Sequence, residues 1–398
     1  MIFPLIAALS VFTVQRAELE LTPPELLPLG GYTARGGKLA QPGGEPLHVR
    51  VAILGHEGVQ VALVSAEMLT IPESLYEEVQ KRVGPKLPLF LVATHTHCAP
   101  DSQMLNSRMT FAIPGIASYK RRWLEWYADR IAEAVMMAAK DIGGIGSPSY
   151  VVAAAPLNRG RRKFAWPDPY VTEFRVSGSP VFTAYAAHAT FHGSDRLTTS
   201  GDWPGLVANK RDTLVFPGAI GDVSPAAEGE SAEAKISAFA ATLGSSLLQR
   251  AMGRGTERDL GHGDLRVLRE PIALEKPKPH PEFAKTNGIP EPLAQSLVDK
   301  FAPTTAEITA FRIGKLAVVG VPGEPTSHLG RRIRDAGRNL GFEWVLVCSH
   351  VNGWMGYILD PTDYGRGGYE ATLAFHGPEA GERVVEASIR ALRDLARR

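Results

Sequence analysis

The amino-acid sequence predicts an α/β protein, a mixed layered domain of sheets and helices with its site at the carboxyl ends of strands. The first observation is an alternation along the chain. Short apolar segments rich in β-branched residues, such as HVRVAILG (48–55), are followed by segments of helical periodicity, such as PESLYEEVQKRV (72–83). This alternation is typical of domains in which helices cover a sheet. The second observation is the abundance of glycine (40) and proline (30), which predicts tight turns between short elements.

The elements follow one another without an internal repeat. The first, VQRAELELTPP, alternates like a strand and stops at Pro23 and Pro24. Seven further apolar segments are expected to be strands, at 48–55, 60–68, 87–95, 181–188, 213–221, 316–324 and 344–353. Five segments with apolar residues at helical spacing are expected to be helices, at 72–83, 119–142, 231–252, 326–337 and 380–398.

Charge and composition exclude some classes of partner. The chain has 398 residues and a formal net charge of +1, so nothing directs it toward nucleic acid. No run of eighteen apolar residues occurs, so no transmembrane segment is expected. The two cysteines, Cys98 and Cys348, are expected to be free buried thiols because two cysteines do not make a disulfide framework in a chain this long.

The first residues, MIFPLIAALSVF, have the apolar content of a signal peptide but lack its positively charged beginning. Residues 1–16 are therefore either a leader for export to the periplasm or the cell exterior, or the first apolar segment of a cytoplasmic protein. Residues 17–398 are expected to form a single domain.

Two polar, turn-rich segments stand between the predicted elements. The proline-rich segment from Glu275 to Pro292 is expected to be a long surface loop, or a lid over a site. The basic segment RGRRKFAWPDP begins at Arg159, and its charged residues Arg161, Arg162 and Lys163 are expected to be solvated.

Polar residues with metal-binding chemistry follow several predicted strands. The segment LFLVATHTH ends in His95 and His97, VFTAYAAH ends in His188, LAVVGVPGE ends in Glu324, and the segment after WVLVCSH leads to Tyr357. Binding groups converge at the carboxyl ends of strands in α/β domains. Imidazole nitrogen and carboxylate oxygen are ligands that Zn²⁺ takes in a tetrahedral shell. An isolated His-x-His pair is nevertheless more often two ordinary polar residues, so the pattern alone leaves both interpretations open.

A second candidate is Ser224 in AIGDVSPA, which follows an apolar segment and a glycine turn. It is either a turn or capping serine, which the local pattern favours, or a site serine with Asp222 nearby in sequence. The chain has no His-Glu-x-x-His helix and no Gly-x-Ser-x-Gly elbow, so the common zinc-protease and serine-hydrolase motifs are absent from its sequence.

Seven segments, taken in order, resemble the catalytic domain of the neutral (alkaline, non-lysosomal) ceramidase family. They are RAELELTPPELLPLGGYTARG, ATHTHCAPD, PLNRGRR, AYAAHATFHGSDRLTTSGDWPG, AIGDVSPA, VGVPGEPTSHLGRRIR and NGWMGYILDPTDYGRGGYEA. The sequence departs from the family at Cys98 and Ala99, which replace serine and glycine, and at His-Ala-Thr in place of His-Pro-Thr. No segment resembles the C-terminal immunoglobulin-like domain of the family.

The resemblance implies one Zn²⁺ per chain, held by four residues: His95, His188, Glu324 and Tyr357. It also implies four further site residues. His97 would lie beside the metal and face the substrate, Arg159 would stabilise an oxyanion, and Tyr369 would donate a hydrogen bond to the developing negative charge. Ser224 would be the family's site serine, either a nucleophile or a polar anchor.

The function that these residues imply is zinc-dependent hydrolysis of an amide C–N bond, in N-acyl sphingosine or a related lipid or small-molecule amide. Two alternatives from other classes remain at this point. One is a metal-free serine hydrolase that uses Ser224. The other is a non-catalytic relative that binds a ligand.

Overall fold

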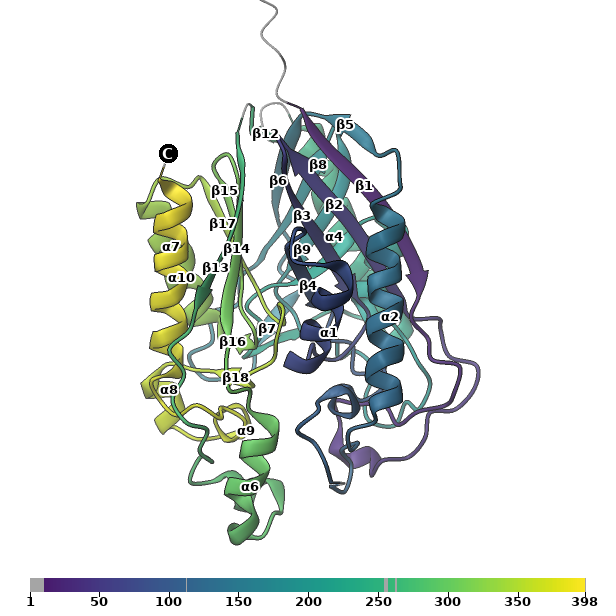
Figure 1. The fold of residues 1–398 in the computed structure, drawn as a ribbon, viewed down its shortest axis with the longest axis vertical. Coiled ribbons are helices and arrows are strands. Elements are labelled where there is room, and N and C mark those ends of the chain that lie inside the picture. The colour runs from purple at the N-terminus through teal and green to yellow at the C-terminus, as the bar shows by residue number, and fades with distance from the viewer. Residues whose placement is uncertain (1–10, 112, 254–256, 262, 398) are drawn as a thin grey trace, which may run out of the picture.

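A computed structural model describes residues 11–111, 113–253, 257–261 and 263–397. It contains three main sheets whose outer faces are covered by helices, which confirms the predicted mixed α/β class. Figure 1 shows two of these layers clearly: one sheet lies against α7 and α10, and another lies against α1 and α2. The predicted strands and helices all occur, with ends shifted by a few residues.

The first sheet has the strand order β4-β3-β2-β1-β5 and is antiparallel except for the β3/β4 pair. Residues alternate between its two faces. Val51, Val64 and Leu91 pack toward the helices, whereas Leu63 and Phe90 point into the centre of the molecule. Its elements are β1 (Phe12–Glu20), β2 (His48–His56), β3 (Val59–Ala66), α1 (Glu73–Val83), β4 (Leu89–Ala93), α2 (Arg121–Ala138) and β5 (Gly144–Gly146).

The second sheet has the order β10-β9-β8-β6-β12 and packs its outer face against α3 and α4. Trp203 and Phe239, one from each helix, contact each other over this face. Its elements are β6 (Pro148–Ala154), β8 (Tyr170–Val176), β9 (Ser179–Tyr185), α3 (Asp202–Arg211), β10 (Leu214–Pro217), α4 (Ala232–Met252) and β12 (Glu257–Asp259).

The third sheet has the order β13-β14-β15-β17 and is covered by α7 and α10. It begins antiparallel and ends with the parallel pair β15/β17, which α7 connects. Its elements are β13 (Leu265–Pro271), β14 (Glu307–Ile313), β15 (Leu316–Gly320), α7 (Ser327–Asn339), β17 (Trp344–Cys348) and α10 (Ala380–Ala396).

The inner faces of the three sheets share one hydrophobic core. Phe90 of the first sheet contacts Phe216 of the second at 5.6 Å and Phe311 of the third at 5.1 Å between ring centroids. All three rings are fully buried. Because each strand places alternate residues on this core, the loops that leave the strands at one end of the molecule are held in fixed positions relative to one another.

Short elements close that end of the molecule, which is the lower end in Figure 1. They are η1 (Thr33–Arg35), η2 (Ser102–Leu105), β7 (Asn158–Gly160), β11 (Val223–Pro225), α5 (Phe283–Asn287), α6 (Glu291–Phe301), β16 (Glu324–Pro325), β18 (Tyr357–Ile358), α8 (Pro361–Gly365) and α9 (Tyr369–Thr372). The segment from Glu275 to Pro292, expected to be a surface loop or lid, instead contains α5 and the start of α6. Phe283 is buried there, so the segment is packed into the fold.

The predicted leader overlaps the fold. Residues 1–10 lie outside the described residues, but Phe12 is fully buried and residues 13–16 pair with β2. A boundary at residue 16 would therefore cut through β1, and the leader itself stays a prediction. Cys98 and Cys348 are both buried and unpaired, as expected. Among the described helices, none combines the length and the apolar character needed to cross a membrane.

Candidate metal centre and active site

The four predicted metal ligands meet in one buried cluster. His95 follows β4, His188 follows β9, Glu324 opens β16 after β15, and Tyr357 opens β18. Each is at most 6% exposed. The cluster therefore lies where strands of all three sheets end.

Short strand pairing holds two of these residues side by side. Glu324 and Tyr357 are register partners in the parallel pair β16/β18, and the Glu324 amide donates to the Gly356 carbonyl at 3.0 Å. Side chains of register partners in a parallel pair point to the same face. The Trp354 indole donates from Nε1 to Glu324 Oε1 at 3.0 Å, which leaves Oε2 facing the cluster.

Three of the six distances between the candidate ligand atoms are close to those of a tetrahedral site. Glu324 Oε2 lies 3.3 Å from His188 Nε2 and 3.7 Å from His95 Nε2, and the Tyr357 hydroxyl lies 3.4 Å from His188 Nε2. Ligands about 2.1 Å from a tetrahedral Zn²⁺ are separated from one another by about 3.4 Å.

Backbone carbonyls fix which imidazole nitrogen faces the cluster. His95 Nδ1 lies 2.8 Å from the Leu69 carbonyl, and His188 Nδ1 lies 2.9 Å from the Val223 carbonyl. A carbonyl only accepts, so each Nδ1 carries the proton and each Nε2 keeps a lone pair directed at Glu324. Hydrogen bonds of this kind orient metal-binding histidines in proteins.

Burial sets the charge state of the cluster. It lowers the pKa of His95, and it lowers the pKa of His188 to about 4, so both imidazoles are neutral at neutral pH and free to donate a lone pair. Burial alone would raise the pKa of Glu324, but His95, His188 and the nearby His350 hold it well below its usual value. The cluster therefore combines neutral nitrogen donors with one carboxylate, the donor set that Zn²⁺ takes.

Several buried polar atoms of the cluster lack a partner within the described part of the chain. They are Glu324 Oε2, His97 Nδ1 and both ring nitrogens of His350. An unpaired buried polar atom is costly and calls for a missing partner. One cation between these groups would satisfy the carboxylate and an imidazole together, so the residues present fit a metal ion.

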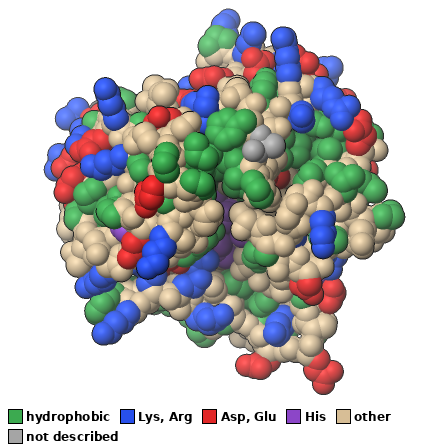
Figure 2. All heavy atoms as spheres, turned by 90° about the horizontal axis from the view of Figure 1, so that it is seen from below, with side chains coloured by type: hydrophobic (Ala, Val, Ile, Leu, Met, Phe, Trp, Pro, Cys, Tyr) green, Lys and Arg blue, Asp and Glu red, His purple; other side chains and the backbone are tan. Residues whose placement is uncertain are grey.

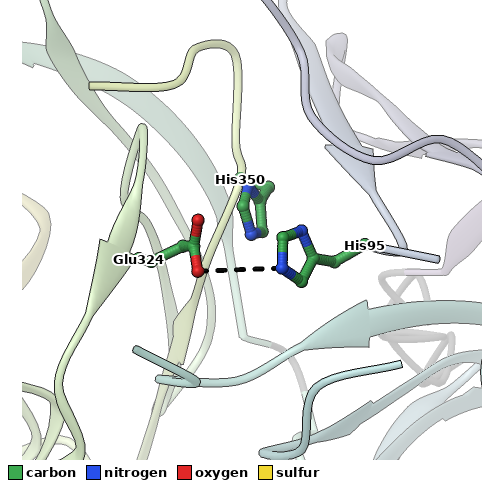
Figure 3. A group of neighbouring side chains, drawn as sticks. All are labelled: His95, Glu324 and His350. Carbon is green, nitrogen blue, oxygen red and sulfur yellow. Dashed lines mark ion pairs between the residues drawn. The ribbon is translucent and has the colours of Figure 1, made fainter. Parts of the chain in front are cut away.

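His350 was not among the residues that the sequence singled out. It lies beside Glu324 and His95 (Figure 3), and these three residues offer ligand atoms that all lie within 4.8 Å of one another. Its sequence context, CSHVNG, reads as the end of an ordinary strand. The available signal was its position two residues past β17, comparable to the position of His95 after β4.

His97 lies next to the predicted ligands, as expected for a group beside the metal. Its Nε2 is 3.3 Å from His95 Nε2, and its ring packs against Tyr32 with 4.7 Å between centroids. Burial, followed by the neighbouring His95 and His188, lowers the pKa of His97 well below its usual value. Its role in catalysis stays a prediction.

The structure corrects the expectation that Arg161 and Arg162 are merely solvated. Arg161 Nη2 donates to the Gly221 carbonyl at 2.7 Å and lies 3.3 Å from His188 Nε2 and 3.5 Å from the Tyr357 hydroxyl. Arg162 pairs with Glu370 at 3.1 Å, and its side chain is 11% exposed. Charge runs are commonly solvated, but this one is folded back over the cluster because the Arg161 amide bonds the Asp222 carbonyl. Lys163 is exposed, as expected.

Arg159, by contrast, is an exposed residue of β7. Its register partner in β11 is Ser224, so it lies at the edge of the site, and its predicted role toward an oxyanion stays a prediction. Tyr369, at the start of α9, is half exposed, and its ring contacts that of Tyr357 at 5.9 Å. Its position at the rim suits a residue that meets a substrate.

Ser224 is 9% exposed and follows Val223, whose carbonyl holds His188. Within the described residues its hydroxyl has no hydrogen bond to a histidine or a carboxylate. Asp222, the residue nearby in sequence, instead accepts from the Ser327 amide at 2.7 Å and the Ser327 hydroxyl at 3.0 Å. The choice between a nucleophile and a polar anchor at Ser224 stays a prediction.

The lower end of the molecule is hollowed at its centre. Figure 2 shows this end with a histidine visible in a central hollow and hydrophobic side chains on the surface around it.

Comparison of the sequence with curated proteins finds neutral ceramidases. Neutral ceramidase 3 of Arabidopsis thaliana is 27% identical over 133 residues, which are 32% of this chain and 17% of that protein. The neutral ceramidase of Pseudomonas aeruginosa is 32% identical over 82 residues, which are 20% of this chain and 12% of that protein. The aligned parts are thus less than a fifth of either relative. No family model matches the chain.

Comparison of the fold extends the similarity over nearly the whole chain. The crystal structure of neutral ceramidase from Pseudomonas aeruginosa superposes with a TM-score of 0.79 and 18% identity, covering 98% of this chain and 75% of that one. A structure described as ceramidase complexed with C2 gives a TM-score of 0.80 at 16% identity. The predicted resemblance to neutral ceramidases is confirmed, in sequence over part of the chain and in fold over nearly all of it.

Proposed function

We propose that this chain is a metal-dependent hydrolase that cleaves an amide C–N bond in an N-acyl lipid or a related N-acyl amide, as a ceramidase does. The metal would be one Zn²⁺ held by His95, His188, Glu324 and Tyr357. The observation that carries the proposal is the convergence of these four side chains from three sheets, with three of their ligand-atom distances between 3.3 and 3.7 Å.

The donor set also suits the chemistry. A bound Zn²⁺ supplies a Lewis acid that polarises an amide carbonyl and lowers the pKa of water to about 7. The protein's part is to hold the ligand atoms in place. It does so through the Leu69 and Val223 carbonyls behind the two histidines and through the Trp354 indole behind Glu324.

Charged and polar side chains around the ligands have separate roles in this proposal. The guanidinium of Arg161 lies beside the Tyr357 hydroxyl and would balance negative charge that develops on the amide oxygen. His97, neutral and adjacent to His95, would accept or return a proton. Tyr369 at the rim would donate a hydrogen bond to the substrate.

The experiment is metal analysis of the purified protein joined to an activity screen on N-acyl amides that includes ceramide. We expect about one zinc per chain, amide hydrolysis that stops in chelator and returns on addition of Zn²⁺, and loss of both zinc and activity in His95→Ala. A purified protein that contains no stoichiometric metal and keeps full activity in chelator would refute the proposal.

The same assay separates the serine-hydrolase alternative. A serine mechanism requires Ser224→Ala to abolish activity while chelators leave the wild-type enzyme unaffected. No histidine or carboxylate forms a hydrogen bond with the Ser224 hydroxyl within the described residues. We therefore expect chelator to abolish the activity of the wild-type enzyme.

A further inference from the structure

The backbone around His350 is held unusually firmly. Its amide donates to the Gly323 carbonyl at 3.0 Å, and its carbonyl accepts from the Ala93 amide at 3.4 Å. The residue adopts a left-handed conformation with φ of +57°, which is unfavourable for a residue other than glycine. Such conformations persist only where the surrounding structure imposes them, and they are concentrated at functional sites.

The neighbours of His350 fix this segment to all three sheets. The Ser349 hydroxyl donates to the Gly218 carbonyl at 2.5 Å, just after β10. The Asn352 side chain accepts from the Leu91 amide at 2.8 Å and donates to the Leu89 carbonyl at 2.8 Å, both on β4. The segment itself continues from β17 of the third sheet. The segment that carries His350 is therefore bonded to all three sheets.

The His350 side chain has no partner of its own. It is fully buried, and neither ring nitrogen makes a hydrogen bond within the described part of the chain. Its ring stacks on that of His95 with 4.2 Å between centroids and 19° between planes. Figure 3 shows the His350 ring beside the gap between Glu324 and His95, with a nitrogen directed toward that gap.

A ring with two unsatisfied nitrogens is expensive to bury, and leucine would fill such a position without that cost. The unsatisfied Oε2 of Glu324 lies in the same cluster. The two kinds of unpaired atom have complementary needs, because a lone pair on nitrogen and a carboxylate oxygen can both bind one cation. The nitrogen and the carboxylate oxygen cannot bond each other when the nitrogen that faces the carboxylate carries no proton, because both atoms are then acceptors.

We propose that His350 is an additional ligand of the metal, so that this chain binds its ion with three imidazoles, from His95, His188 and His350, together with Glu324. The proposal rests on the proposed function, because it concerns the same ion. It goes beyond it by adding a ligand that the resemblance to ceramidases does not include.

The geometry allows this with small movements. The candidate ligand atoms of His95, Glu324 and His350 lie within 4.8 Å of one another. Ligand atoms around one tetrahedral Zn²⁺ are about 3.4 Å apart. Binding would therefore draw the outermost pair together by at most about 1.4 Å, which side-chain rotations supply.

The test compares His350→Leu with His376→Leu in the full chain. His376 is a matched control, because it is also buried and also has an unpaired ring nitrogen, but its Nδ1 bonds the Glu275 carbonyl and it is outside the ligand cluster. Two quantities are measured on each protein: Zn²⁺ affinity by competition with a chromogenic chelator, and the visible absorption spectrum of the Co²⁺ form, which reports coordination.

We expect His350→Leu to weaken Zn²⁺ binding by more than about 100-fold, beyond the roughly 10- to 100-fold that loss of a group behind a ligand costs. We also expect the Co²⁺ bands to change in position or intensity, while His376→Leu leaves both quantities at wild-type values. In chelator, the metal-free His350→Leu protein should unfold at a temperature no lower than wild type, since it no longer buries an unsatisfied ring.

A His350→Leu protein with wild-type Co²⁺ bands would overturn the proposal, and so would a loss of thermal stability that is equal in the presence and absence of metal, which indicates a purely structural ring. If the leucine variant does not fold, His350→Gln is measured in its place with the same two outcomes. A wild-type protein that binds no metal refutes the proposed function itself. If the wild-type protein binds zinc and substitution of His350 changes neither the Zn²⁺ affinity nor the Co²⁺ bands, only this inference is refuted.

Discussion

Replacement of Arg161 by methionine tests which arginine of the basic segment serves the site. Arg159→Met is the matched control, because it makes the same change two residues away on an exposed side chain of β7. Arg161 instead reaches the Tyr357 hydroxyl and His188 Nε2. The two variants therefore remove the same charge, one from inside the cluster and one from its edge.

The magnitude follows from the distance. A unit negative charge at 3.5 Å from the guanidinium, the distance of the Tyr357 hydroxyl, interacts with it by about 5 kcal/mol at an effective dielectric constant of about 20. The Arg161 side chain is 25% exposed, so solvent screens part of this interaction. We expect a loss of about 3 kcal/mol of transition-state stabilisation, a roughly 100-fold fall in kcat/KM, which is comparable to removal of one oxyanion-hole donor.

The assay is steady-state hydrolysis of the best amide from the substrate screen, with kcat and KM measured separately. Arg161→Met should lower kcat, while Arg159→Met should stay within about 3-fold of wild type, as exposed substitutions usually do. Thermal unfolding and zinc content are measured alongside, so that a folding defect or lost metal is not mistaken for lost catalysis. A 100-fold loss in Arg159→Met together with near-normal Arg161→Met would refute the assignment.

Three further predictions concern His188 of the cluster and two residues that contact the cluster, Trp354 and Gly31. Trp354→Phe removes the donor to Glu324 Oε1 and should weaken Zn²⁺ binding roughly 10- to 100-fold, measured by chelator competition; unchanged affinity would show that the indole does not orient the carboxylate. Burial lowers the pKa of His188 to about 4 in the folded protein. Between about pH 6.5 and pH 4, His188 is therefore protonated in the unfolded chain but not in the folded one. The metal-free protein should lose up to about 3 kcal/mol of stability from this group as the pH falls through that window, and His188→Gln should not show that part of the loss in urea unfolding at pH 7 and pH 4.5. Gly31 has φ of +88° and a Cβ there would collide with the His97 ring, so Gly31→Ala should destabilise the protein by about 1–3 kcal/mol in denaturant unfolding and lower activity; a silent substitution would show that the His97 ring is free to move.

Most of the fold was predictable because strand and helix periodicities are local properties of the sequence. The alternation in the segment from His48 to Gly55, for example, divides its side chains between the helix-covered face and the central core. The convergence of His95, His188 and Glu324 was predictable for a related reason. Each stands directly after a strongly apolar strand, and strands of one layered domain tend to end on the same side.

The contact of Arg161 with the cluster was harder to predict because this residue lies in irregular structure. Arg159 matches the motif of the resembling family, but a strand of three residues determines little about where the next side chains point. The path of the chain after β7 depends on the bond from the Arg161 amide to the Asp222 carbonyl, which are far apart in sequence. No periodicity in the basic segment contains that information.

His350 shows a different kind of limit. Its sequence context indicates only a strand end, because what makes it a candidate ligand is a junction of three sheets that its neighbours create. The left-handed backbone at His95 (φ of +64°) and at His350 (φ of +57°) occurs on two loops that face each other across the site. Two strained residues that stack their rings against each other cost stability, and the three-sheet core supplies the rigidity that maintains them. If His350 binds the ion, His350→Gly, which removes the imidazole together with the strain, should weaken metal binding, whereas a ring with no such role predicts a variant that keeps its affinity for zinc.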